Sequence, residues 1–109
     1  MAVYMTQWSY TPQAWANLAK NPENREAPLK ALIEEKLGGR LISMYYCFGE
    51  YDGIAIYEQA DETTAMAGVL AAIAPGHLKA TKTTALLTVK QAMDAMGKAG
   101  AIAYPAPKG

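Results

Sequence analysis

The chain has 109 residues, which is the length of one domain, since single domains run to roughly 100–200 residues. Its ten basic and ten acidic residues cancel, which argues against a nucleic-acid partner, because such proteins carry clustered positive charge. A single cysteine, Cys47, excludes an internal disulfide and a multi-thiolate zinc site. No run approaches the roughly 18 apolar residues of a membrane span, and no signal peptide is recognisable, so we expect a cytoplasmic protein without membrane contacts.

The first half of the chain predicts a strand followed by an interrupted helical region. Residues 2–10 are mostly aromatic, β-branched or apolar, which is typical of a strand. Thr11 and Pro12 form an N-cap followed by a proline at the first helical position, so a helix is expected to begin there. Pro22 interrupts it, because proline removes a backbone hydrogen bond. Apolar residues at helical spacing then continue until Gly38-Gly39, where the helical region is expected to end.

The second half predicts a hairpin, a helix, a strand and a last helix. Residues 40–48 and 54–58 are strand-like and are separated by a short turn, which favours a hairpin. Asp61 is a candidate N-cap for the helix that follows, and its apolar stripe ends at a Pro-Gly pair. Residues 77–87 predict the fourth strand. Thr88-Val89-Lys90-Gln91 fits a capping box, so a short helix should open there.

This order of elements is that of the α+β, ferredoxin-like fold, also called the split βαβ arrangement. In this fold two helices cover one face of a four-stranded antiparallel sheet, and here an extra C-terminal helix would follow. We expect the domain to span residues 1–100 and residues 101–109 to form a loosely held tail, because the tail carries two prolines.

Both faces of the two middle strands are apolar. The third strand, for example, carries Ile54 and Ile56 on one side and Ala55 and Tyr57 on the other. Two helices can cover only one face, so the other face predicts a homodimer through the sheet, with higher assemblies allowed. We expect Ile54 and Ile56 to be the pair buried against the helices, in which case Ile56→Ala would cost about 2–5 kcal/mol.

The hairpin turn carries a family resemblance. Residues 45–53 read Tyr-Tyr-Cys-Phe-Gly-Glu-Tyr-Asp-Gly, which resembles the signature of the GYD domain family. Gly49, Tyr51 and Asp52 match the signature positions, and the remaining elements fit in order over about residues 3–96. The resemblance implies a dimeric α+β barrel of ferredoxin-like subunits. It implies no particular reaction and no catalytic residues.

His77 and Asp52 are the candidate acid/base residues. His77 is the only histidine, and a histidine has a pKa suited to proton transfer at neutral pH. If the strands bring Asp52 close to it, the two side chains would form a catalytic pair. The alternatives are structural: a surface or turn histidine for His77, and turn formation for Tyr51 and Asp52. Cys47 has no neighbouring base and is expected to be a buried, unreactive thiol.

Aromatic residues of the first two strands and the hairpin could line a ligand pocket or, alternatively, fill the core or a dimer interface. The candidate ligand-binding residues are Tyr4, Trp8, Tyr45, Tyr46 and Tyr51. The first functional hypothesis is therefore a protein that binds a small apolar molecule. The second is a cofactor-independent oxygenase or isomerase acting on a small aromatic or lactone substrate, and the third is a structural oligomerisation module. No cofactor is expected, and no metal site either, since no paired histidine or cysteine spacing is present.

Overall fold

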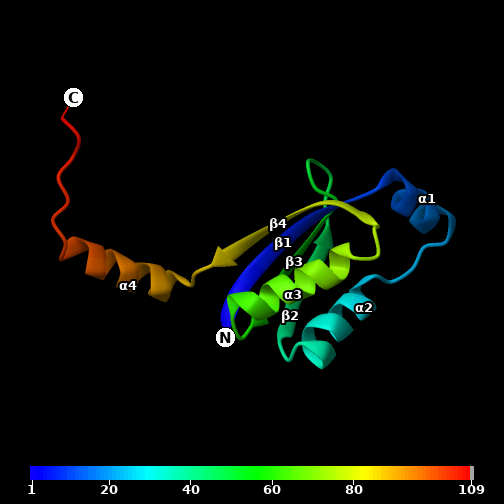
Figure 1. The fold of residues 1–109 in the computed structure, drawn as a ribbon, viewed down its shortest axis with the longest axis horizontal. Helices are drawn as coiled ribbons and strands as arrows, with labels where there is room; N and C mark the ends of the chain where they lie inside the picture. The colour runs from blue at the N-terminus through cyan, green and yellow to red at the C-terminus, as the bar shows by residue number, and fades with distance from the viewer. Residues whose placement is uncertain (109) are drawn as a thin grey trace.

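A four-stranded antiparallel sheet in the order β2-β3-β1-β4 forms the centre of the molecule (Figure 1). The computed structural model describes residues 1–108. The elements are β1 (Ala2–Tyr10), α1 (Pro12–Lys20), α2 (Glu26–Lys30), the π-helical turn η1 (Ala31–Lys36), β2 (Arg40–Tyr46), β3 (Gly53–Gln59), α3 (Glu62–Ile73), β4 (Leu78–Leu86) and α4 (Val89–Gly100). The α2–η1 segment and α3 lie on the same face of the sheet (Figure 1). The ferredoxin-like fold predicted from the sequence is confirmed.

Local capping chemistry sets the starts of three helices. The Thr11 hydroxyl accepts a hydrogen bond from the backbone N–H three residues further on, at 3.1 Å, and opens α1. The Asp61 carboxylate does the same for α3 at 2.8 Å. At α4 the predicted capping box is complete, because Thr88 and Gln91 each accept from the other's backbone N–H. Each cap satisfies a backbone donor that the first helical turn leaves unpaired.

The faces of β3 are the reverse of the sequence-based prediction. Ala55 and Tyr57 are buried on the helix-covered face, whereas Ile54 and Ile56 alternate onto the opposite face and are only half-buried. The prediction that the two isoleucines pack against the helices is therefore wrong. Because side chains alternate strictly, one fixed contact decides the orientation of the whole strand.

That fixed contact is made by Trp8 and Gly53, which pair across β1 and β3. The Trp8 indole lies over Gly53 so closely that a Cβ added at this glycine would overlap the ring. Only glycine leaves room for the ring, so Gly53 must sit beneath Trp8 on the helix-covered face. Ala55 and Tyr57 then follow on the same face, at the positions the sequence pattern alone leaves ambiguous.

The hairpin between β2 and β3 begins earlier than predicted. β2 ends at Tyr46, so Cys47 lies in the loop and is exposed. The prediction of a buried thiol is wrong, because the apolar run continues past the last residue that pairs with β3. Phe48, next to it, is fully exposed at the tip of the hairpin.

The C-terminal helix α4 extends away from the sheet and the other helices (Figure 1). No residue of α4 is buried, and Met93 and Met96 on it are mostly exposed. Residues 102–108 of the predicted tail have no regular secondary structure, and its last residue, Gly109, lies outside the described residues. Among the described helices, none combines the length and the apolar character that crossing a membrane requires.

Candidate functional site

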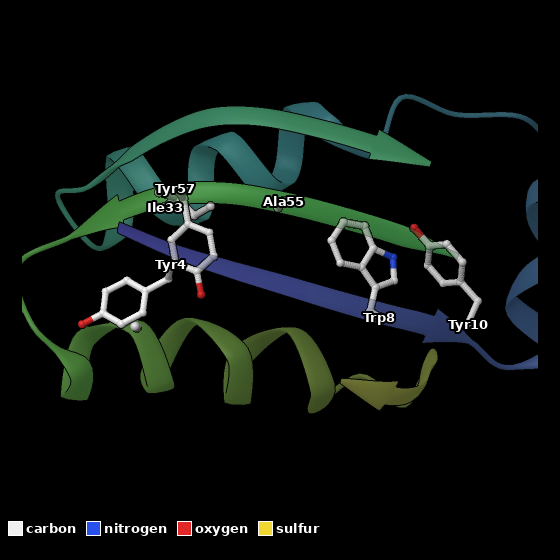
Figure 2. Close-up of a cluster of buried hydrophobic side chains, with 7 residues drawn as sticks. Tyr4, Trp8, Tyr10, Ile33, Ala55 and Tyr57 are labelled. Atoms are coloured by element: carbon white, nitrogen blue, oxygen red, sulfur yellow. The ribbon is translucent and has the colours of Figure 1, made fainter. Parts of the chain in front are cut away.

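A pocket of about 230 Å³ lies between the helix-covered face of the sheet and the helices α2–η1 and α3. Trp8 of β1 and Ala55 and Tyr57 of β3 form part of its floor (Figure 2). Leu32 and Ile33 of η1 contribute one wall. Figure 2 shows the lining residues Trp8 and Tyr10 toward one end of the sheet and Tyr57 toward the other, so the pocket follows the strands.

Small residues on α3 leave the space for this pocket. Ala65, Gly68 and Ala72 recur at three- and four-residue spacing and all line the pocket. α3 also lies close to the end of η1, because a Cβ added at Gly68 would be 3.2 Å from the Leu37 side chain. Larger side chains at these helix positions would fill the pocket, as they do in an ordinary packed core.

Hydroxyl groups supply polar contacts on the pocket floor. The Thr6 hydroxyl lies 2.8 Å from the Tyr57 hydroxyl and 2.9 Å from the hydroxyl of Thr83 on the adjacent strand. Thr6 and Tyr57 both line the pocket. This chain of hydroxyls satisfies the buried phenol, and it places hydrogen-bonding groups on an otherwise apolar floor.

Gln59 is a pocket residue that the sequence analysis missed. Its side chain is 1% exposed, and its amide oxygen has no hydrogen-bond partner among the described residues. The amide packs against Gly39, where an added Cβ would overlap both this side chain and the Glu58 carbonyl oxygen. The sequence gives one signal for Gln59: it follows Ala55 and Tyr57 at two-residue spacing. That spacing places it on the same face of β3, and the signal becomes readable only when the buried face of β3 is known.

His77 lies at the opposite end of the pocket, on its lining, and is half-buried. Its ring centroid is 6.2 Å from that of Tyr10, and its carbonyl oxygen accepts a hydrogen bond from the Thr11 N–H at 3.0 Å. Burial, and then the positive charge of Arg25, lower the pKa of His77. The imidazole is therefore neutral at neutral pH, with one donor and one acceptor nitrogen.

Asp52 does not line this pocket and has a structural role. Its carboxylate oxygen Oδ2 accepts hydrogen bonds from the Tyr10 backbone N–H at 2.8 Å and from the Trp15 indole N–H at 3.1 Å. These bonds tie the hairpin to the end of β1 and to α1. The structure thus places His77 on the pocket lining and Asp52 outside that lining, with its carboxylate already accepting two hydrogen bonds.

The predicted aromatic residues are distributed over several environments. Trp8 lines the pocket, and Tyr4 stacks on Tyr57 at 5.9 Å and lines a shallow recess beside α3. Tyr45 is 67% exposed and pairs with Ile54, so it lies on the helix-free face. Tyr51 is half-buried in the hairpin and lines neither cavity.

Tyr46 belongs to an aromatic cluster at the His77 end. Its ring centroid lies 6.5 Å from that of Tyr10 and 6.2 Å from that of Trp15. Burial, followed by the neighbouring Tyr10 side chain, raises the pKa of Tyr46 to about 12. The phenol therefore stays protonated and neutral at neutral pH. The aromatic cluster therefore adds no negative charge at the His77 end.

Comparisons with known proteins agree with this fold. The crystal structure of FFRP-DM1 superimposes with a TM-score of 0.55 at 16% sequence identity, covering 80% of this chain and 100% of that one. At that identity the likeness concerns the fold alone. No curated protein matches the chain significantly. The model of the GYD domain matches residues 4–96, which is most of the sequence. The chain therefore belongs to the GYD domain family.

Proposed function

We propose that this protein binds a small, largely apolar organic molecule in the pocket between the sheet and the helices. The observation that carries the proposal is the pocket of about 230 Å³ itself, whose lining is mainly apolar, with a few polar groups at defined places. That division is usual for small-molecule sites, in which apolar walls supply burial and a few polar groups fix the orientation.

The pocket favours ligand binding over the two alternatives. A purely structural module needs no cavity beside its core, whereas here α3 carries alanines and a glycine where larger side chains would pack. An enzyme of the predicted kind needs an acid/base pair at its pocket, whereas Asp52 does not line the pocket and its carboxylate is bound by Tyr10 and Trp15. Binding without chemistry is therefore the function that the geometry supports best.

A larger side chain on α3 that fills the pocket is expected to weaken ligand binding. In Ala72→Phe a phenyl ring would occupy the space beside η1, so affinity for the neutral probe p-cresol should fall at least about tenfold, a loss of about 1.4 kcal/mol. The matched control is Ala67→Phe, because Ala67 is exposed on the same helix and does not line the pocket. Chemical-shift titration of the labelled protein with p-cresol measures the affinity of both variants. If the two variants bind p-cresol as well as the wild type does, the probe occupies some other site.

We also propose that the protein self-associates through the helix-free face of the sheet. That face carries Val3, Met5, Ile54 and Ile56, which the protein's own helices leave uncovered. Apolar side chains gathered on one sheet face commonly mark an interface between subunits. A second copy of the chain would cover them by packing sheet against sheet.

Charge on this face should disrupt the assembly and leave the subunit folded. Ile56→Lys places an ammonium group at the centre of the proposed interface, so sedimentation at micromolar concentration should show a monomer. Ala16→Lys adds the same charge to the exposed face of α1 and should leave the assembly unchanged. A wild-type protein that is already monomeric at these concentrations would contradict the proposal.

A further inference from the structure

We infer that the ligand of the pocket is a small apolar monocarboxylate, with its carboxylate at the Arg25–His77 end and its apolar body over Trp8. This inference rests on the proposed function and adds the chemical class of the ligand. It follows from the charge, the shape and the donor groups of the residues that line the pocket.

The pocket lining carries a positive charge and no negative charge among the described residues. Among the described lining residues, Arg25 alone carries a full charge at neutral pH, and none is acidic. The remaining polar side chains carry neutral hydroxyls, the Gln59 amide, the indole N–H of Trp8 and the imidazole of His77. A cation beside an apolar cavity attracts an anion more strongly than in open water, because less solvent screens the interaction.

Arg25 has donors left for a ligand. It makes an exposed ion pair with Glu23, from one guanidinium nitrogen at 2.8 Å, with the two side chains 32% and 56% exposed. Such a pair contributes little, and a guanidinium has five N–H donors, so further N–H groups are free for a second carboxylate. Because Arg25 is half-buried and Glu23 lies outside the lining, a bound carboxylate would sit on the pocket side of the guanidinium.

His77 and Tyr10 complete the polar end. Both line the pocket, and their ring centroids lie 6.2 Å apart with the ring planes tilted by 30°. Arg25 lines the same pocket, and its positive charge is the second cause, after burial, of the lowered pKa of His77. A neutral imidazole can donate a hydrogen bond to a carboxylate, which gives the anion a second partner besides the guanidinium.

The lining and the volume of the pocket limit the charge and the size of the rest of the ligand. Apart from Arg25, no described lining residue carries a full charge, so the second carboxylate of a dicarboxylate would find no ionic partner in the pocket. An apolar cavity of about 150 Å³ accommodates benzene in another protein. By that scale, the volume of about 230 Å³ fits one ring with a short side chain.

The test compares two probes of the same shape. Phenylacetate and phenylacetamide differ in charge but scarcely in size, and each is titrated into the full-length protein with chemical shifts as the readout. We expect phenylacetate to bind about tenfold more tightly, since charge-assisted hydrogen bonds are roughly twice as strong as neutral ones. Arg25→Gln should reduce phenylacetate affinity to that of the amide and change amide affinity less than about twofold.

The controls separate charge at the pocket from charge on the protein. Lys36→Gln removes the same charge from an exposed position of η1 outside the lining and should leave the preference intact. Arg25→Lys keeps the charge and should retain part of the preference, which shows that the loss in Arg25→Gln is not due to misfolding. Equal affinity of the wild type for both probes, or a preference that survives Arg25→Gln, would overturn the monocarboxylate inference alone. Absence of binding by either probe would overturn the proposed function together with it.

Discussion

Trp8→Ala is expected to lower the free energy of unfolding by about 3–5 kcal/mol, which is the usual cost of deleting a buried indole. Trp8 is only 7% exposed and covers Gly53, so its removal leaves a void on the helix-covered face of the sheet, near the start of β3. The void would join the pocket, because Trp8 also lines it. Urea denaturation at a fixed protein concentration measures the change, since self-association would otherwise shift the apparent stability.

Two further variants distinguish the Trp8–Gly53 contact from simple loss of volume. Trp8→Phe keeps a ring over the glycine and should cost less than half as much as Trp8→Ala. Gly53→Ala leaves Trp8 in place but adds a methyl group that overlaps its ring, which should cost about 1–3 kcal/mol by overpacking. If Gly53→Ala were neutral, the contact would not be what fixes the faces of β3.

Asp52→Ala is expected to cost about 1.5–3 kcal/mol, which is the range for a hydrogen bond to a charged group. The substitution leaves the Tyr10 N–H and the Trp15 indole N–H without their carboxylate acceptor. Tyr10 is 5% exposed, so water cannot readily replace the lost partner at its backbone. The loss should appear in denaturation and also as a change in Trp15 fluorescence.

The same hairpin loop supplies the matched control for Asp52. Glu50→Ala removes a negative charge from an exposed residue of that loop and is expected to change stability by less than about 0.5 kcal/mol. Asp52→Asn keeps a side-chain oxygen as an acceptor and should recover about half of the loss. Equal effects of Glu50→Ala and Asp52→Ala would indicate that loop charge matters and the two hydrogen bonds do not.

The sequence predicts only part of the candidate site. His77 and Trp8 were predicted and do line the pocket. Arg25 and Gln59 were missed, because an arginine between two helices and a glutamine at a strand end carry no motif. The prediction of an acid/base pair of Asp52 and His77 rests on residue type alone. In the structure the Asp52 carboxylate accepts hydrogen bonds from Tyr10 and Trp15.

The sequence by itself determined the order of the elements, their caps and the family, because these depend on neighbouring residues. Thr11, Asp61 and Thr88 open their helices through bonds that span three residues, so the local pattern suffices. Only the tertiary structure decided which face of β3 is covered and where a pocket remains. Both depend on Trp8 lying over Gly53 and on α3 lying close to η1, contacts between distant residues that strand alternation and helical spacing leave open.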